Sequence, residues 1–338
     1  MTDPNERYSR QMRFAGIGAE GQEKLRQGRV AILGCGALGS GVAQNLGRAG
    51  VGYLRIVDRD VLELSNLARQ VLFDAEDVRR RMPKAVAAAR RLNAINPDIA
   101  IEPMVCEISP ANVLKLIEGV DLVVDGSDNM ETRFLLNDAC IKAGRTWVYG
   151  GAVGSSGMCM TIQPGAGPCL RCVLEDLPGA SALKTCNEVG VLNTLTSTVS
   201  ALQSNEAIRL LVGAGPNPGL LRFDIWEQRF DRSRVQRRPD CPACGLRRFE
   251  FLDAPPASSV RVRGRSQVEI AASRSTPLDL ASLAGSLRSA GEVSYNGYVV
   301  FLTLPGAELI IFADGRVIVQ GVADESAARD LVARYVGA

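Results

Sequence analysis

RVAILGCGALG, residues 29–39, joins an apolar run to a G-x-G-x-x-G motif, and a helical pattern of apolar residues follows it over 42–49. The run predicts a buried β-strand, and the motif predicts the turn from that strand into a helix. Glycines in such a turn let the backbone approach a phosphate group at the positive end of the helix. Gly34, Gly36 and Gly39 are therefore predicted to bind a nucleotide, although the motif alone does not specify which one.

The flanking sequence continues this alternation of strand and helix. Asp58 closes the next predicted strand, at a position where a carboxylate accepts hydrogen bonds from ribose hydroxyls. Strands are predicted at 53–57, near 99–103 and at 120–124 and 146–149, with helices starting near Lys84 and Ser109 and spanning 130–144. The pattern predicts an α/β fold with a doubly wound, Rossmann-like parallel sheet. Its ligands bind where the strands end, here at Gly34, Asp58 and Asp125.

The second half of the chain predicts an extension of this domain and a separate small unit. Residues 150–190 read as irregular around a strand near 158–162, and residues 193–212 as a helix with Leu195, Val199, Leu202 and Ile208 on its apolar side. Residues 253–259 are typical of a linker. We expect a main domain over 1–253 and a small C-terminal α+β domain over 260–338. The latter has predicted strands near 260–270 and 298–320 and helices near 277–290 and 323–336.

Composition narrows the classes of function. The 338 residues carry a formal net charge of +2, which is too small to indicate nucleic acid or an anionic membrane as partner. No apolar run is long enough to span a bilayer and the N-terminal residues do not resemble a signal peptide, so a cytoplasmic location is expected. The nine cysteines, an odd number, favour reduced thiols. The lack of histidine excludes a Ser-His-Asp triad, a histidine general base and His-ligated zinc.

Three charged residues beyond the glycine motif suit a triphosphate and its metal ion. Arg69 and Lys84 are candidates to hold the β and γ phosphates. Asp128 is a candidate Mg²⁺ ligand, because Mg²⁺ binds through carboxylates and bridges phosphate oxygens. Each residue also has an ordinary structural interpretation: Arg69 as a surface arginine, Lys84 as a solvated lysine at a helix start and Asp128 as a helix N-cap.

Cysteine spacing indicates a metal site. Cys169 with Cys172 and Cys241 with Cys244 form two C-x-x-C pairs, whose four thiolates suit a closed tetrahedral site for structural zinc. A redox C-x-x-C is the alternative, less favoured because two pairs occur and neither opens a thioredoxin-like unit. Cys186, in a polar stretch before a predicted helix, is either a candidate nucleophile or a passive loop cysteine.

In their joint order these motifs resemble the ThiF/MoeB/HesA family, the bacterial relatives of ubiquitin-activating E1 enzymes. The resemblance runs from Arg7 to about Gly245. It is carried by RYSRQ (7–11), GCGALG (34–39), VDRD (57–60), SNLARQ (65–70), PKA (83–85), DGSDN (125–129) with Arg133, both C-x-x-C pairs and TCNEVGVL (185–192). The tail, with FADGRVIVQG (312–321), resembles the extension of longer ThiF-type proteins.

The resemblance implies a role for each matching residue. Asp58 would hold the ribose of ATP and Asp128 would hold Mg²⁺. Phosphate contacts are implied for Arg10, Asn66, Arg69 and Lys84, and Arg133 is a further candidate for the same cluster. Arg10 would act across a dimer interface. The four paired cysteines would bind Zn²⁺. Cys186 matches a cysteine that bonds covalently to the carrier in ThiF-type members and is dispensable in MoeB-type members.

The implied function is ATP-dependent adenylylation of the C-terminal glycine carboxylate of a ubiquitin-like sulfur-carrier protein by a homodimer, before a persulfide donor supplies sulfur. The carrier would be ThiS- or MoaD-like. Pathways to thiamine, molybdopterin, cysteine and siderophores all use such pairs, and the tail favours the thiamine carrier. The tail itself would help to dock the carrier or would serve as a stabilising cap.

Two alternatives share part of the pattern. An NAD-dependent Rossmann oxidoreductase would use the glycine motif and Asp58 but has no need of Arg69, Lys84 and Asp128. A non-catalytic binder of a ubiquitin-like protein would not need to retain those three residues either.

Overall fold

A computed structural model describes residues 6–174, 189–254, 260–263, 267–271, 277–322 and 324–337. The chain divides into two compact units by its internal contacts. The first comprises Met1–Arg79 and Lys84–Ala254, and the second comprises Arg80–Pro83 and Pro255–Ala338.

An eight-stranded sheet forms the first unit, in the order β3-β2-β1-β4-β5-β6-β7-β8. Its parallel part consists of β1 (Arg29–Leu33), β2 (Tyr53–Val57), β3 (Ala100–Met104), β4 (Leu122–Asp125) and β5 (Trp147–Val153). Its antiparallel part consists of β6 (Ser156–Ile162), β7 (Leu220–Asp224) and β8 (Arg229–Ser233). The predicted doubly wound α/β class with an extension is confirmed. The β7–β8 hairpin was not predicted, because β8 is an exposed edge strand without an apolar face.

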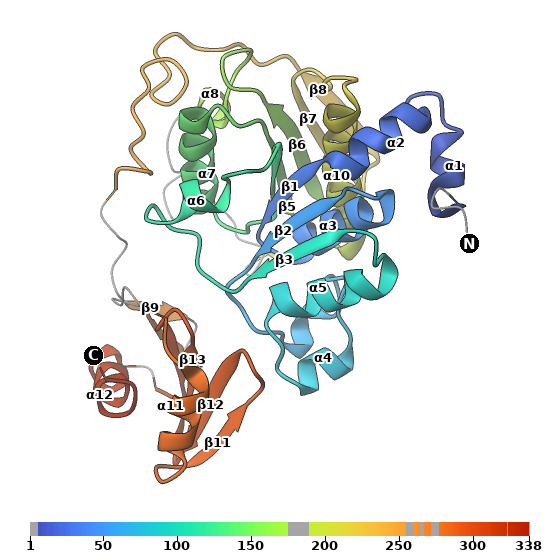
Figure 1. Cartoon of the computed structure of the whole chain (residues 1–338). Helices are drawn as coiled ribbons and strands as arrows, with labels where there is room; N and C mark the ends of the chain where they lie inside the picture. Colours follow the sequence, from blue (N-terminus) through green and yellow to red (C-terminus); the bar gives the residue numbers. More distant parts are fainter. Residues whose placement is uncertain are drawn as a thin grey trace. The chain divides into compact units, whose positions relative to one another are not determined.

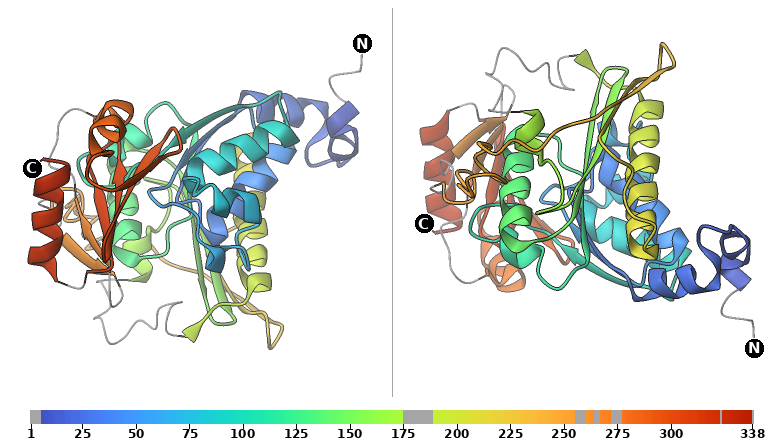
Figure 2. Two further views of the ribbon diagram at one scale, coloured as in Figure 1. Left: turned by 90° about the horizontal axis from the view of Figure 1, so that it is seen from below. Right: turned by 90° about the horizontal axis from the view of Figure 1, so that it is seen from above.

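Helices cover both faces of this sheet (Figures 1 and 2). One face carries α3 (Ala37–Ala49), α5 (Lys84–Ile95) and α10 (Asn193–Val212), and the other carries α6 (Val113–Leu116) and α7 (Met130–Ala143). The remaining elements are η1 (Glu6–Tyr8), α1 (Ser9–Met12), α2 (Gly18–Gln27), η2 (Leu64–Asn66), α4 (Ala75–Arg79) and α8 (Leu170–Val173). Because both faces are covered, the central strands are apolar along their length: every residue of β4 is buried, as is every residue of β1 after Arg29.

The long helix α10 packs against α3 through small residues. On its predicted apolar side, Leu195 and Val199 are buried and Leu202 packs against the same cluster, whereas Ile208 is only partly buried. Ser200 faces Gly41, where an added Cβ would lie 2.6 Å from the serine hydroxyl, and this hydroxyl donates to the carbonyl of Thr196 at 2.7 Å. Small residues such as Ser200 and Gly41 were not part of the predicted apolar side, and their short side chains let the two helices approach closely.

The second unit contains a six-stranded antiparallel sheet in the order β11-β12-β13-β14-β10-β9. Its strands are β9 (Val260–Arg263), β10 (Gln267–Ile270), β11 (Glu292–Tyr295), β12 (Val299–Leu304), β13 (Ala307–Phe312) and β14 (Val317–Gln320). Two helices, α11 (Leu280–Leu287) and α12 (Glu325–Tyr335), pack on one face around Val300, Leu302 and Leu309. The predicted α+β character is therefore observed, whereas β11 was missed because none of its four residues is buried and only Val293 is partly buried.

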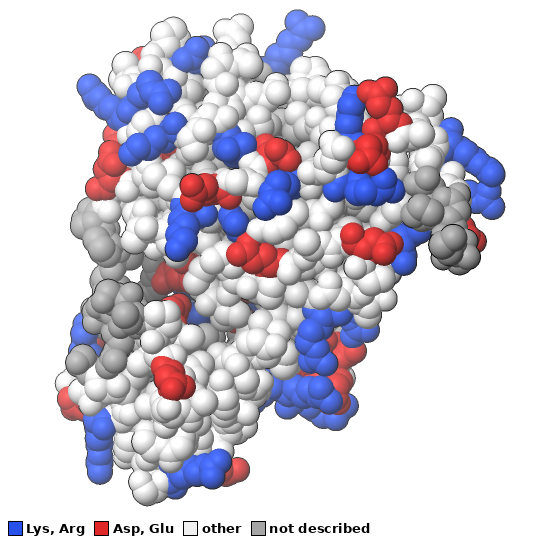
Figure 3. Space-filling view, viewed as in Figure 1, with Lys and Arg blue, Asp and Glu red and all other residues white. Residues whose placement is uncertain are grey.

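Two further properties concern membrane-spanning helices and the distribution of surface charge. No helix in the described ranges combines the length and the apolar character needed to cross a bilayer. On the face drawn in Figure 3, basic and acidic side chains are intermingled and do not gather into one continuous patch of a single sign.

Candidate nucleotide and metal sites

The carboxyl ends of three strands meet at one edge of the large sheet. Leu33, the last residue of β1, pairs with Val57 of β2 on one side and with Asp125 of β4 on the other. The loops that follow β1 and β4 touch through their backbones, since a Cβ added to Gly34 would lie 2.5 Å from the backbone of Gly126. Strand order reverses here, which is where doubly wound sheets bind ligands.

The three glycines of the turn meet different requirements. Gly34 has a φ of 98°, in the left-handed region that favours glycine. A Cβ on Gly39 would lie 1.9 Å from the carbonyl oxygen of Gly34, so only glycine closes the turn. At Gly36, the N-cap of α3, the nearest described atom to an added Cβ is the Gln70 amide at 3.9 Å. The N–H groups of the first turn of α3 thus face space that a phosphate can enter.

A cluster of buried charges lies beside this turn. The Asp58 carboxylate, in a residue 8% exposed, accepts hydrogen bonds from the N–H of Cys35 at 2.7 Å and the N–H of Asp60 at 2.8 Å. Lys84, 7% exposed, donates from Nζ to Asp60 Oδ2 at 2.9 Å, and its N–H donates to the Asp60 carbonyl at 2.9 Å. Asp58 therefore fixes the glycine turn, and Asp60 accepts hydrogen bonds from both the side-chain ammonium and the backbone N–H of Lys84.

The pKa values of this cluster follow from burial and from neighbouring charges. Burial lowers the pKa of the Lys84 ammonium, but Asp58, Asp60 and Asp128 together raise it more, so its pKa lies above the ordinary value. Burial raises the pKa of the Asp58 carboxyl, and the Lys84 ammonium opposes that change. Burial also raises the pKa of the Cys35 thiol, which stays protonated. Lys84 is consequently charged at neutral pH and suited to a polyanion.

Asp128 lies on the loop between β4 and α7 with its carboxylate exposed. The N-cap of α7 is its neighbour Asn129, whose Oδ1 accepts from the N–H of Thr132 at 2.8 Å. Asp128 is near enough to Lys84 to raise the pKa of that ammonium. An exposed carboxylate on a loop that lies against the glycine turn is a suitable ligand for a hard cation such as Mg²⁺.

Two further side chains hold this loop. Arg133 donates from Nε to Asp125 Oδ2 at 3.1 Å and from Nη2 to the Ser127 carbonyl at 2.9 Å, so its guanidinium is committed to the protein. Gln203 of α10 donates from Nε2 to the Asp125 carbonyl at 2.7 Å. Neither Gln203 nor the pairing of Arg133 with Asp125 was predicted from the sequence. For Gln203, the one signal available was a long polar side chain within a helix of small residues.

Asn66 and Arg69 lie on the segment that follows β2. Asn66, 7% exposed, accepts through Oδ1 from the N–H of Glu63 at 3.1 Å and closes a capping box around η2. Arg69 donates from Nη1 to the Ser65 carbonyl at 3.0 Å. Within the described part of the chain, its guanidinium has no other hydrogen bond, and such open planar donors suit phosphate oxygens.

Arg10 lies near the ends of the strands opposite to the glycine turn. Its neighbour Tyr8 packs on Gly50, just after α3, and accepts from Asn96 Nδ2, just after α5, at 2.8 Å. These contacts place the arm beside the amino ends of β2 and β3 (Figure 1). A five-residue strand is about 16 Å long, so Arg10 does not join the nucleotide residues of its own chain.

Four cysteines from two distant segments come together. The sulfur atoms of Cys169, Cys172, Cys241 and Cys244 all lie within 4.8 Å of one another. Cys169 and Cys241 are 3.6 Å apart, and Cys172 and Cys244 are 3.4 Å apart. Tetrahedral coordination with zinc–sulfur bonds of about 2.3 Å separates the sulfurs by about 3.8 Å. The cluster can therefore hold a metal ion.

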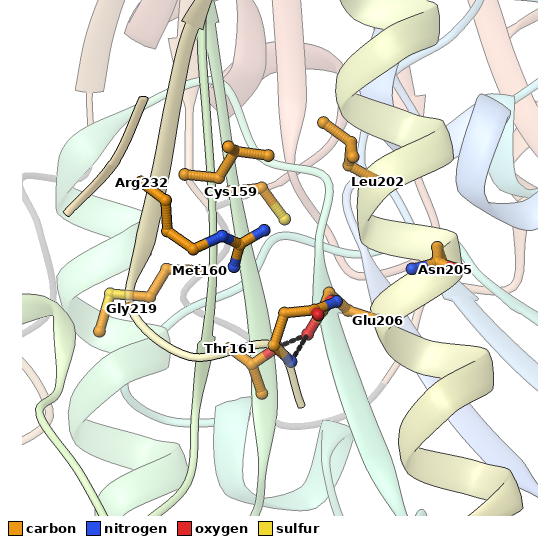
Figure 4. Close-up of a pocket in the computed structure, with 10 residues that line it drawn as sticks. Cys159, Met160, Thr161, Leu202, Asn205, Glu206, Gly219 and Arg232 are labelled. Carbon is orange, nitrogen blue, oxygen red and sulfur yellow. Dashed lines mark hydrogen bonds between the residues drawn. The ribbon is translucent and has the colours of Figure 1, made fainter. Parts of the chain in front are cut away.

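A small cavity lies apart from these residues, between β6, β7 and α10 (Figure 4). Its volume is about 40 Å³, which suffices for about three water molecules and not for a nucleotide. Glu206 in its wall accepts from Thr161 Oγ1 at 2.8 Å and from the N–H of Asn217 at 3.0 Å. The cavity is thus separate from the candidate site.

Cys186 lies outside the described residues, and its role stays a prediction.

Comparisons with known proteins agree with this geometry. The profile of the ThiF family matches residues 8–243. The sulfur carrier protein ThiS adenylyltransferase of Bacillus subtilis (strain 168) is 40% identical over 337 residues, covering 98% of this chain and 99% of that protein. A sulfur carrier protein adenylyltransferase of Thermus thermophilus is 40% identical, covering 71% and 90%. The crystal structure of E. coli MccB with ATP has a TM-score of 0.63 at 25% identity, covering 71% and 75%.

Proposed function

Because the chain belongs to the ThiF family, we propose that it is an ATP-dependent adenylyltransferase for the C-terminal glycine carboxylate of a ubiquitin-like sulfur carrier. The observation that carries the proposal is the placement of the Lys84 ammonium and the exposed Asp128 carboxylate beside the glycine turn. Hydride transfer from a dinucleotide has no use for that lysine–carboxylate pair. We propose further that residues 1–253 are the adenylylation domain, with residues 260–338 as a separate domain.

The residues present fit ATP as substrate and Mg²⁺ as its partner. Gly36 leaves room for phosphate, and each Asp58 oxygen keeps a lone pair for a ribose hydroxyl. Asp58, Asp60 and Asp128 would repel a bare triphosphate, so a divalent cation is needed for the charges to balance. Asp128 would hold Mg²⁺, which would supply neutralisation of the phosphate charge.

The chain's own residues would act by positioning and by charge. Lys84 and Arg69 hold the β and γ phosphates, and Asn66 donates from its amide. One oxygen of the carrier carboxylate attacks the α-phosphorus; a new P–O bond forms, the bond to the bridging oxygen breaks, and pyrophosphate leaves with the electron pair. The carboxylate is already ionised near neutral pH, so no general base is required, which suits a chain without histidine.

Replacing Asp128 tests this assignment. Asp128→Ala is expected to lower ATP–pyrophosphate exchange, measured with a carrier ending in Gly-Gly, by about 100-fold or more, because charge on the leaving group is no longer neutralised. Its thermal unfolding midpoint should stay that of the wild type, since the carboxylate is exposed. Glu131→Ala, an exposed acid three residues away, is the matched control and should retain exchange. Near-normal exchange by folded Asp128→Ala would remove this residue from the mechanism.

We propose that Arg10 completes the site of a second copy of the chain. The arm lies at the far edge of its own sheet, so its exposed guanidinium can serve a nucleotide only across a dimer interface. A closed twofold dimer would then contain two sites, each built from both chains.

Mixing inactive variants tests this arrangement. Arg10→Ala and Asp128→Ala homodimers should both be inactive, but a mixed dimer regains one site with both native residues. Random exchange of equal amounts should therefore recover about a quarter of wild-type pyrophosphate exchange. No recovery in a mixture shown by mass to contain mixed dimers would contradict the proposal, and so would normal exchange by Arg10→Ala alone.

We propose that the four-cysteine cluster binds Zn²⁺ as a structural ion. Elemental analysis of protein purified without chelator should find about one zinc per chain. Cys244→Ser should lose the zinc and lower the unfolding midpoint, because metal binding contributes directly to folding free energy. Cys106→Ser, outside the cluster, should keep both. A zinc-free wild-type protein would rule the site out.

We propose that Cys186 acts after adenylylation. Its thiolate would attack the acyl carbon of the adenylate, forming a thioester as AMP leaves. Cys186→Ala should therefore retain pyrophosphate exchange and lose the covalent enzyme–carrier species seen by intact mass spectrometry without reductant. Cys106→Ser should form that species normally. If Cys186→Ala, given a persulfide donor, makes thiocarboxylate at the wild-type rate, the cysteine is a bystander and the adenylate passes directly to the donor.

A further inference from the structure

The segment Arg80–Pro83 lies in the first third of the sequence, but its contacts make it part of the C-terminal unit. They follow α4, and Lys84 comes directly after them as the first residue of α5. Any constraint that the C-terminal unit places on this segment therefore acts on the backbone just before a proposed phosphate-binding residue.

Arg81 is fixed by its side chain. Its guanidinium makes a two-pronged ion pair with Glu308 of β13, with Nη1–Oε1 at 2.7 Å and Nη2–Oε2 at 2.6 Å. The same guanidinium lies 3.7 Å from the centre of the Phe301 ring. Glu308 pairs with Thr303, two residues from Phe301 along β12, so both contacts come from one face of the sheet. Paired N–H···O bonds of this kind are strong and directional, so they set the orientation of the arginine.

Arg81 is also fixed by its backbone. Asn296 donates from Nδ2 to the Arg81 carbonyl at 2.9 Å and to the Arg80 carbonyl at 3.3 Å. The Asn296 Oδ1 accepts from the N–H groups of Tyr298 and Val299, so the amide itself is held in place. Arg81 has a φ of 51°, in the left-handed region that residues with a side chain rarely adopt. Such a conformation persists where the surroundings determine it, and here the C-terminal unit does so.

We propose that the C-terminal unit positions Lys84 for ATP through its hold on Arg81, with Arg81 and Glu308 as positioning residues. The inference rests on the proposed function, in which Lys84 binds the phosphates of ATP. Between the two residues, Met82 is 4% exposed, Pro83 is buried, and proline has a fixed φ. Only two residues separate Arg81 from Lys84, so a shift at Arg81 displaces the backbone just before Lys84. A displacement of about 1 Å is enough to weaken the fit of a charged group to its ligand.

A purely stabilising role for the same contacts makes a different prediction. Loss of the Arg81–Glu308 pair would then lower the unfolding temperature and leave ATP affinity unchanged. A positioning role lowers ATP affinity in protein that is still folded at the temperature of the assay. The affinity for ATP is thus the measurement that separates the two.

Calorimetric titration of the full-length protein with Mg·ATP, without carrier so that no ATP is consumed, tests the proposal. Arg81→Ala and Glu308→Ala are expected to raise the Kd for ATP about tenfold, and Glu308→Gln to raise it less. Arg79→Ala is the matched control, because this arginine lies two residues earlier, is 72% exposed and pairs with Glu76 on its own helix. It should bind ATP as the wild type does. Unfolding midpoints of all variants establish that they are folded at the assay temperature.

Exchange of the two charges supplies the decisive comparison. Arg81→Glu and Glu308→Arg should each weaken ATP binding, and the double variant should bind within about threefold of the wild type, since the ion pair is re-formed with opposite polarity. Failure of the double variant to recover affinity would overturn the inference.

Lys84→Ala separates this inference from the proposed function. If Lys84→Ala binds ATP weakly while folded Arg81 and Glu308 variants bind it normally, the inference is overturned and the proposed function stands. If Lys84→Ala binds ATP as tightly as the wild type, the proposed role of Lys84 fails and the inference fails with it.

Discussion

The loops after β1 and β4 pass each other with no room for a side chain between them. A Cβ on Gly126 would lie 2.2 Å from the carbonyl oxygen of Gly34, and a Cβ on Gly39 would lie closer still to that oxygen. This contact brings the first turn of α3, the Asp58 carboxylate and the loop of Asp128 to one edge of the sheet. The chemistry proposed for the protein depends on that convergence, because the helix N–H groups and the carboxylates must reach the same ligand.

Local sequence predicts the elements that carry this edge. The bounds of β1 and β2 follow from apolar runs that stop at Gly34 and Asp58, and α10 ends at Gly213, which has a φ of 87°. The partners of the charged residues were not predictable in the same way. Asp60 lies 24 positions from Lys84, and Gln203 lies 78 positions from Asp125, so only the folded chain brings each pair together. The four-cysteine cluster was easier to predict, because two C-x-x-C pairs indicate a metal site however many residues separate the pairs.

The arm that carries Arg10 shows a different limit of sequence reasoning. The family resemblance implies that Arg10 contacts phosphate across a dimer interface, but a match along the chain does not show how far the residue lies from the glycine turn of its own chain. The contacts of Tyr8 with Gly50 and Asn96 attach the arm to the amino ends of the strands, one strand length from the glycine turn. An arginine can be essential and remote at once only if the complete site needs two chains.

Charge balance connects these features to the chemistry. Three carboxylates, those of Asp58, Asp60 and Asp128, raise the pKa of the Lys84 ammonium. Carboxylates at this position favour the magnesium complex of a triphosphate over the bare anion, because like charges repel. A carboxylate nucleophile needs no base, so the rate depends on how accurately the phosphates and the carrier tail are placed. Lys84 is correspondingly held from both directions along the chain, by the buried first turns of α5 after it and by the constrained Arg81 segment before it.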